Sequence, residues 1–405
     1  MRRLWKILWV VLLVAFLSQT PFIYRRYKLG RLDAKIRELN AAREVPHDPA
    51  YADYRGVIHV HSFLGGHSTG TFAEIERAAQ ANGLAFVMMT EHPSGDYDTR
   101  SLTLRGVRGG VLFVQGNETS ESAEDRLLTF GGTSASDDAP AVASTQDSVN
   151  RAKAAGQLVF IAHAETFRSW RETRGFDGME IYNLHADAKN INRLSLFFDG
   201  LWSYRSYPHL LWTRFYTSPD ANLRRFDELT AGEGRTVVAI AGNDAHANIG
   251  LSLRQLAGKP LLELKLDPYE RSFQVVRTHI LLPNDLPLDE ANLLHALARG
   301  HAYVSFDILC DASGFRFQAT NGTEQKLMGD EIALSSGVRL QVETPSRSRI
   351  VLLRNGQVVR EESGATKLEW TTNEAGVYRV VCYLPQLPAP LDAKPWIISN
   401  PIYVR

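Results

Sequence analysis

Cysteine is scarce in this 405-residue sequence, which contains only Cys310 and Cys382. Two cysteines are too few and too far apart to form a metal knuckle, so that kind of metal site is excluded. We expect two buried thiols. A disulfide between them becomes an alternative only if the chain is exported, because disulfides persist in oxidising compartments.

The sequence also lacks net charge, since 45 Lys and Arg residues balance 45 Asp and Glu residues. Proteins that bind long nucleic acids usually carry a basic surface, and no basic stretch lies near the motifs described below. We therefore expect no long nucleic acid as partner or substrate. The length is enough for two or three domains with a large buried core.

A clear cleavage site is missing from the N-terminal segment, in which two arginines precede an apolar run from Ile7 to Leu17. This arrangement is typical of a signal sequence or a signal anchor. The apolar run alone is short for a membrane span, but the stretch from Leu4 to Tyr24 reaches the required length. We therefore expect an uncleaved signal anchor or transmembrane helix in residues 1–24.

A charged, helix-prone juxtamembrane spacer is expected in residues 25–54. Its basic residues Arg25, Arg26, Lys28 and Arg31 follow the apolar run, which argues against export under the positive-inside rule. We nevertheless favour a membrane-anchored protein whose catalytic domain is extracytoplasmic. The alternative is a cytoplasmic enzyme tied to the membrane by the same helix.

The stretch from Gly56 to His92 has the pattern of a strand, a helix and a second strand, with metal-ligand residues at both strand ends. The first strand ends at His59 and His61, which point to one face if the strand is extended. His67 follows in a glycine-rich loop. A helix starts at a capping box formed by Thr71 and Glu74. The second strand then leads to Glu91 and His92.

Three more apolar strand patterns end in the same kind of residue. They lead to Glu118, to His163, and to Asp244 and His246. Each pattern alone is modest evidence, but five in succession favour a metal site. Alternating strands and helices predict a parallel sheet, and a closed or nearly closed barrel brings the carboxyl ends of its strands together at one rim.

This set of motifs resembles the PHP family, the polymerase and histidinol-phosphatase class of metal-dependent phosphoesterases. The family blocks HxH, TDH, GxE, AHP and DxH correspond, in order, to His59/His61, Thr90-Glu91-His92, Gly116-Asn117-Glu118, Ala162-His163-Ala164 and Asp244-Ala245-His246. Glu91 departs from the usual Asp, and Ala164 from the usual Pro. Residues 178–183 and 396–401 resemble the carbaryl-hydrolase-type branch.

The resemblance implies an α/β fold with a distorted (β/α)7 barrel in residues 55–311. It implies that His59, His61, Glu118 and Asp244 form the catalytic metal site. The full set of metal ligands would be His59, His61, His67, Glu91, His92, Glu118, His163, Asp244 and His246. Glu91 would act either as an outer ligand or as a partner that orients an imidazole.

Mixed imidazole and carboxylate ligands suit Mn, Zn or Fe better than Ca or Mg. We expect two or three divalent transition metal ions. Family members with three metals use a histidine between the GxE and AHP motifs, whereas this chain has none between Glu118 and His163. The available replacements are Glu121, Asp125, Asp137, Asp138 and His185.

Two further segments carry no metal motif. Residues 186–230 are rich in aromatic side chains, and we favour helices packed on the barrel over a lid or an apolar substrate wall. Residues 312–405 show short alternating strands, and Asn355-Gly356 predicts a type I′ hairpin. We expect a small antiparallel β-sandwich with a structural or interaction role.

The pattern as a whole predicts a metal-dependent hydrolase that acts on a small phosphate ester or phosphodiester through metal-activated water. One alternative keeps the metals and hydrolyses a carboxyl or carbamate ester. Another is a membrane-tethered binding module with a vestigial barrel. The expected partners are a small-molecule substrate and the membrane.

Overall fold

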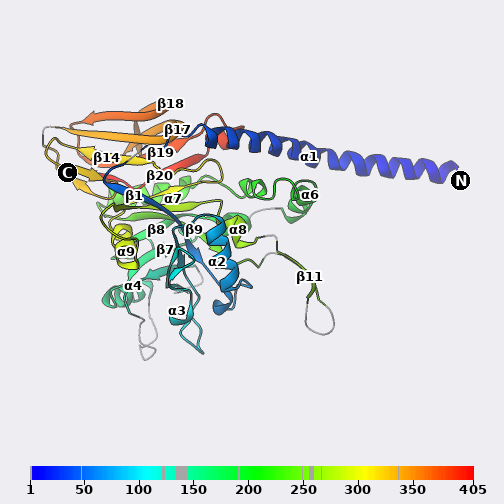
Figure 1. Cartoon of the computed structure of the whole chain (residues 1–405), viewed down its shortest axis with the longest axis horizontal. Helices are drawn as coiled ribbons and strands as arrows, with labels where there is room; N and C mark the ends of the chain where they lie inside the picture. Colours follow the sequence, from blue (N-terminus) through cyan, green and yellow to red (C-terminus); the bar gives the residue numbers. More distant parts are fainter. Residues whose placement is uncertain are drawn as a thin grey trace.

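The structure is a computed structural model of the whole chain, and it shows a mixed α/β body from which one long helix projects (Figure 1). It describes residues 2–46, 48–120, 124–133, 144–189, 192–248, 250–254, 260–265, 267–335 and 337–405.

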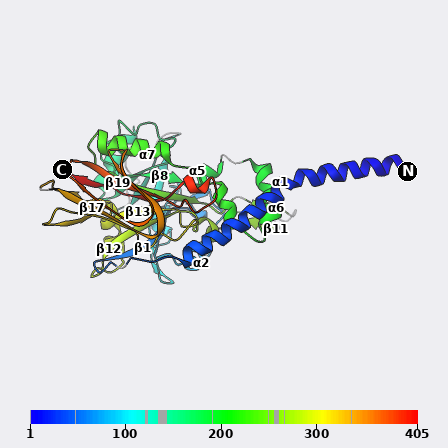
Figure 2. The ribbon, with the colours of Figure 1, turned by 90° about the horizontal axis from the view of Figure 1, so that it is seen from above.

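Helix α1 (Arg2–Ala41) is continuous through Pro21 and has two different halves. Its first half is exposed, and by length and composition it is apolar enough to cross a membrane, as a signal sequence also is. Its second half packs on the body and buries Leu32 and Leu39 there. A single helix therefore covers the predicted membrane anchor and the first part of the predicted spacer, up to Ala41 (Figure 2).

The centre of the body is a sheet of six parallel strands in the order β4-β2-β1-β9-β8-β7. These strands are β1 (Tyr51–Val60), β2 (Phe86–Met89), β4 (Val111–Val114), β7 (Leu158–Ala162), β8 (Gly178–Asn183) and β9 (Val238–Ala245). Most of their buried side chains are apolar, as expected for a parallel sheet covered on its faces. Two antiparallel strands, β6 (Arg126–Phe130) and β5 (Gly116–Ser120), extend the sheet beyond β7.

Helices and short helical turns follow most of these strands. Helix α2 (Phe72–Ala81) begins at the predicted capping box, with both reciprocal hydrogen bonds between Thr71 and Glu74 present. The other helices are α3 (Thr99–Leu102), α4 (Thr145–Ala154), α5 (Leu184–Lys189), α6 (Arg193–Ser203), α7 (Asp220–Asp227), α8 (Tyr269–Ser272) and α9 (Glu290–Ala298). The short turns are η1 (Phe63–Gly65), η2 (Leu210–Arg214), η3 (Glu228–Gly232) and η4 (Leu391–Ala393).

The predicted barrel is not confirmed, because the sheet is not closed. Strand β5 approaches the β2 side only through a single isolated bridge between Glu91 and Asn117, and not through a ladder of hydrogen bonds. A further hairpin strand, β3 (Gly106–Arg108), pairs with β4. The carboxyl ends of the parallel strands still lie at one edge, which is the feature that the metal-site prediction needs.

The predicted separate β-sandwich is not confirmed either, because the C-terminal strands continue the same sheet. Strand β12 (Arg277–Pro283) pairs with β1, β13 (Ala302–Ser305) pairs with β12, and β20 (Pro395–Ser399) pairs with β13. The remaining strands are β10 (Gly250–Arg254), β11 (Pro260–Lys265), β14 (Arg316–Thr320), β15 (Gln325–Leu327), β16 (Glu331–Ile332), β17 (Val338–Arg354), β18 (Gln357–Thr372), β19 (Gly376–Tyr383) and β21 (Ile402–Val404).

Two smaller predictions for the C-terminal region are confirmed. Asn355 and Gly356 both have positive φ, 51° and 77°, and join β17 to β18 in a tight hairpin. Cys310 and Cys382 are free, buried thiols.

Asn400 connects the C-terminal strands to β9, which carries Asp244. Its buried amide accepts a hydrogen bond from Ala239 N at 2.7 Å and donates to the carbonyls of Ala239 and Ala302 at 3.1 and 2.8 Å. Asn400→Ala would remove three side-chain hydrogen bonds to buried backbone groups, so we expect the free energy of unfolding to fall by roughly 3 kcal/mol. Chemical denaturation measures the loss, with the exposed Asn373→Ala as control. Equal stability of the two variants would contradict this role.

Candidate metal centre

His59 lies in a bulge at the end of β1. The register between β1 and both neighbours, β2 and β9, shifts between Ile58 and Val60. The backbone of His59 is left-handed there, with φ of 68°. His59 and His61 therefore reach the same site through a bulge and a loop, and not through the simple alternation of an extended strand.

The same backbone feature recurs at two other strand ends. His163 follows β7 and Asp244 lies near the end of β9, and both have φ of 48°. Left-handed backbone is unfavourable for residues other than glycine and tends to occur at functional sites. Its presence at three strand ends that meet in space is a local sign of a built site.

Four buried side chains form the first donor group, His59, His61, Glu118 and Asp244. Their ligand atoms all lie within 4.8 Å of one another. Nε2 of His59 lies 3.2 Å from Glu118 Oε2 and 3.4 Å from Asp244 Oδ1, and Nε2 of His61 lies 3.3 and 3.4 Å from the same two oxygens. Two imidazoles and two carboxylates thus face one point.

A second donor group adjoins the first and consists of His61, His92 and His246. The ring of His61 stacks between the other two, with centroid separations of 4.6 and 4.3 Å. Glu118 Oε2 also lies 3.5 Å from His92 Nε2. The two groups therefore share His61 and meet at the Glu118 carboxylate.

The donor atoms fit a cation because several are buried without any hydrogen-bond partner. Within the described residues, these atoms include Nε2 of His59, His61 and His163, and Oε2 of Glu118. Leaving a buried polar atom unpaired costs about 1–3 kcal/mol, and several in one cluster need an explanation. A divalent ion that accepts imidazole and carboxylate donors provides one, and Mn, Zn and Fe have this preference.

The buried carboxylates favour the protonated form of the histidines that face them. Burial alone lowers the pKa of His59, but Glu180, Asp244 and Glu118 outweigh it and raise the pKa well above its ordinary value. Burial likewise opposes the shift at His163, whose pKa is raised to about 10 by Glu118 and then by Glu165, Asp244 and Glu180. A bound cation would replace these protons, so metal affinity should fall as pH is lowered.

His92 and His246, which belong only to the second donor group, have pKa values shifted in the opposite direction. Burial, and then the neighbouring His61, lower the pKa of His92 to about 4 and that of His246 to about 3. Both imidazoles are therefore neutral near pH 7, which is the form that binds metals.

Glu180 orients His59 from behind. Its Oε1 lies 2.6 Å from His59 Nδ1, while Oε2 accepts hydrogen bonds from His163 N and Asn183 Nδ2. This arrangement leaves Nε2 of His59 directed at the donor group, as in other carboxylate–histidine–metal sites. The contact requires Gly242, because a Cβ there would lie 1.9 Å from Glu180 Oε1. In the sequence, Glu180 is part of the branch resemblance in residues 178–183, and this role was not predicted.

Glu91 is not brought into either donor group. Its carboxylate accepts hydrogen bonds from Ser62 N, Ser62 Oγ at 2.6 Å and Thr103 Oγ1 at 2.8 Å. It therefore fixes the backbone just after His61. Metal ligation by Glu91 stays a prediction.

His67, His163 and His185 lie at the edges of the two donor groups. The exposed His67 ring is 4.7 Å from His92, and the His185 ring is 5.0 Å from His246, both measured between centroids. His163 Nε2 lies 3.3 Å from Glu118 Oε1 and 3.4 Å from an Asp244 oxygen. Ligation by His67 and His163 likewise stays a prediction.

Asp125 is the only carboxylate considered as a replacement ligand that lies within the described residues, and it does not fill the gap. Asp125 is engaged elsewhere, because its oxygens accept hydrogen bonds from Arg168 N, Ser169 Oγ and Thr145 Oγ1. Glu121, Asp137 and Asp138 lie outside the described residues.

Arg126, which sequence reasoning missed, reaches the site from the start of β6. Its guanidinium nitrogen Nη1 lies 3.2 Å from Glu118 Oε1, the oxygen that also faces His163. Its side chain is 37% exposed, so this cation lies between the buried donors and solvent. The sequence feature that could have identified this residue is its place at the start of the strand-like run Arg126–Phe130, between Glu118 and His163.

No family model and no curated protein matches the chain. Among solved structures, the chain is similar to a two-domain protein from Bacteroides vulgatus ATCC 8482 containing a predicted PHP-like metal-dependent phosphoesterase. The identity is 14% and the TM-score 0.41, over 89% of this chain and 98% of that chain. It is also similar to PsfC from Pseudomonas syringae PB-5123, at 14% identity and TM-score 0.34 over 59% and 86%. Endonuclease Q bound to a 27-mer duplex with an abasic lesion shows 12% identity and TM-score 0.36 over 70% and 60%.

Proposed function

We propose that the chain is a metal-dependent hydrolase of a small phosphate ester or phosphodiester, in the carbaryl-hydrolase-type branch of the PHP family. The observation that carries the proposal is the pair of adjoining donor groups with unpartnered buried donor atoms. The first group would hold one divalent ion, and the second group would hold another. Such ions polarise a phosphoryl oxygen and lower the pKa of bound water.

The chain's own residues supply binding and orientation. Glu180 holds the His59 ring, and Glu91 holds the backbone after His61. Arg126 places a cation beside the donor groups, and a guanidinium is well matched to an anionic phosphoryl group. This placement favours a phosphoryl substrate over a neutral carboxyl or carbamate ester. The proposal further places the protein at a membrane, with the catalytic body outside the cytoplasm.

Metal removal tests the proposal. After chelation and dialysis, the full chain should lose hydrolysis of p-nitrophenyl phosphate or bis(p-nitrophenyl) phosphate, and added Mn, Zn or Fe should restore it. His295→Ala, which removes an exposed histidine outside the site, serves as a control that should behave like the parent. Activity that survives metal removal would contradict the proposal.

The same assay separates the competing functions. Hydrolysis of p-nitrophenyl acetate or a naphthyl carbamate, with neither phosphate substrate cleaved, would assign the site to carboxyl or carbamate esters. Metal binding without turnover of any of these substrates would instead favour a binding module.

A further inference from the structure

Helix α6 packs on α1 with one side and leaves an apolar side exposed. Phe198 contacts Phe22 with ring centroids 5.1 Å apart, and Trp202 Nε1 donates to Gln19 Oε1 at 3.1 Å. The exposed side consists of Leu194, Phe197 and Leu201, which are 67%, 55% and 68% exposed. Their spacing places them along one stripe of the helix. Large apolar side chains gathered on one exposed face mark an interaction surface.

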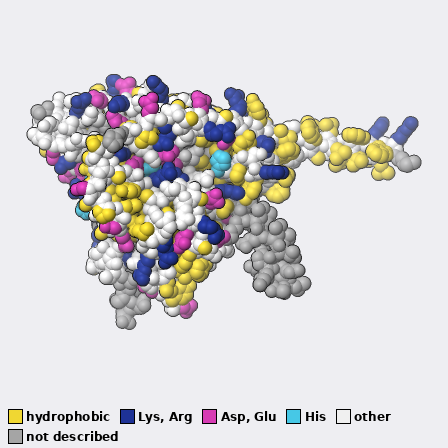
Figure 3. Space-filling view, in the orientation of Figure 1, with side chains coloured by type: hydrophobic (Ala, Val, Ile, Leu, Met, Phe, Trp, Pro, Cys, Tyr) yellow, Lys and Arg dark blue, Asp and Glu magenta, His cyan; other side chains and the backbone are white. Residues whose placement is uncertain are grey.

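The position of α6 along α1 points to what covers this stripe. The contacts involve the segment from Gln19 to Arg26, where the exposed apolar half of α1 ends. Figures 1 and 2 both show α6 beside the middle of α1, and Figure 3 shows hydrophobic side chains along the protruding part of that helix. If α1 crosses a bilayer, α6 therefore lies at the boundary between hydrocarbon and headgroups.

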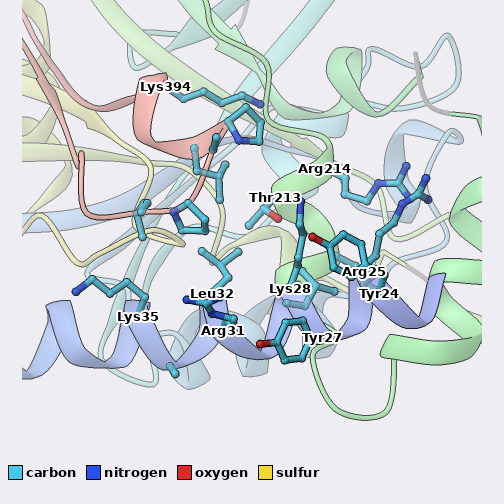
Figure 4. Close-up of a pocket in the computed structure, with 18 of the residues that line it drawn as sticks. Tyr24, Arg25, Tyr27, Lys28, Arg31, Leu32, Lys35, Thr213, Arg214 and Lys394 are labelled. Carbon is cyan, nitrogen blue, oxygen red and sulfur yellow. The ribbon is translucent and has the colours of Figure 1, made fainter. Parts of the chain in front are cut away.

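The side chains of α1 become basic where its exposed apolar half ends. A groove of about 1020 Å³ opens between α1, η2 and the loop around η4 (Figure 4). Arg25, Lys28, Arg31 and Lys35 of α1 line it, with Arg214 and Lys394 from the body. Asp199 and Glu38 are its acidic lining residues. The excess of basic side chains directly beyond the apolar segment complements anionic lipid headgroups.

We propose that α6 is a membrane-surface helix, which inserts Leu194, Phe197 and Leu201 into the interface of an anionic bilayer beside α1. Amphipathic helices bind membranes in this orientation, with the apolar side in the headgroup–acyl boundary. Together with α1, α6 would provide a second point of attachment that fixes how the catalytic body is oriented on the membrane. The aromatic segment 186–230 therefore contributes a membrane contact, and not only packing on the body.

Site-specific fluorescence tests the proposal on the full chain reconstituted in vesicles of phosphatidylcholine and phosphatidylglycerol. An environment-sensitive probe is attached to the cysteine introduced by Phe197→Cys. The native thiols Cys310 and Cys382 are buried, so the introduced cysteine is the one labelled. Val358→Cys is the matched control, because Val358 is 59% exposed on β18, away from α6 (Figure 1). We expect nitroxide-labelled lipid to quench the Phe197→Cys probe and iodide to quench it poorly. The Val358→Cys probe should show the reverse.

A probe at Leu12→Cys reports separately whether α1 is in the bilayer. Lipid quenching at position 12 with iodide quenching at position 197 would overturn the role of α6 and leave the α1 anchor intact. Protection of position 197 from both quenchers would overturn it in favour of a protein that covers the stripe. Iodide quenching of the probe at position 12 would show that α1 is not in the bilayer, which overturns the premise of the proposal. None of these outcomes depends on the hydrolase activity.

Discussion

Glu118→Gln is expected to remove metal binding and turnover together, lowering the rate roughly 1000-fold or more. One carboxylate oxygen of Glu118 lies 3.2–3.5 Å from Nε2 of His59, His61 and His92, and the other lies 3.3 Å from His163 Nε2. Glutamine has nearly the same shape as glutamate, but it lacks the negative charge that lies beside both donor groups. Loss of a single preorganised polar partner already costs about 100- to 1000-fold in rate, and Glu118 serves two groups at once.

Metal analysis and the phosphate assay check this expectation on the same preparation. Glu331→Gln changes an exposed glutamate on β16 and should retain the parent's metal content and rate. Circular dichroism shows whether the Glu118 variant is folded, and Asp244→Asn provides a second, independent removal of charge from the first group. A folded Glu118→Gln protein with full metal content and normal turnover would contradict the assignment.

The local pattern of the site could be read from the sequence because strand ends are marked by short-range signals. The apolar strand pattern predicted before Glu118 corresponds to β4, and the one predicted before His163 corresponds to β7. The four side chains predicted for the first site also come together in the structure. Each of these inferences needs only a buried strand followed by polar residues, and the carboxyl ends of parallel strands meet at one edge.

The architecture around the site depends on long-range pairing and could not be predicted in the same way. Whether β20 pairs with β13 is decided by residues almost a hundred positions apart, so a continuing sheet and a separate sandwich have similar sequence patterns. The bulge at His59 and the contact of Glu180 with that ring are likewise set by tertiary neighbours. The exposed apolar stripe of α6 looks in sequence like a core-facing helix, because exposure is not encoded in hydrophobic periodicity alone.

Arg126 also became visible only when β5 and β6 were placed side by side. In this antiparallel pair Glu118 lies opposite Leu128, and Arg126 reaches back along the ladder to Glu118 Oε1. The guanidinium therefore lies beside the Glu118 oxygen that also faces His163. A fixed cation there disfavours a second cation nearby, so we predict that the parent protein holds no third metal ion on this side of Glu118.

Arg126→Ala is expected to lower kcat/KM for phosphate substrates by roughly 100-fold, because a preorganised cation next to the reacting group is lost. Metal content should not fall, since Arg126 is not a donor. Arg108→Ala, which removes an exposed arginine on β3, is the matched control. Equal losses with p-nitrophenyl phosphate and the uncharged p-nitrophenyl acetate would contradict recognition of an anionic group.

Arg126→His separates the two roles of this side chain, because it removes the permanent cation and adds an imidazole on the Glu118 Oε1 side. Together with His163 Nε2, which lies 3.3 Å from that oxygen, the new ring would complete a set of three donors. We expect metal analysis to show an additional ion in Arg126→His but not in Arg126→Ala. Arg126→Lys keeps the charge without the planar fork, so its metal content should stay at the parent value. Unchanged metal content in all three variants would show that Arg126 does not stand in for a metal ion.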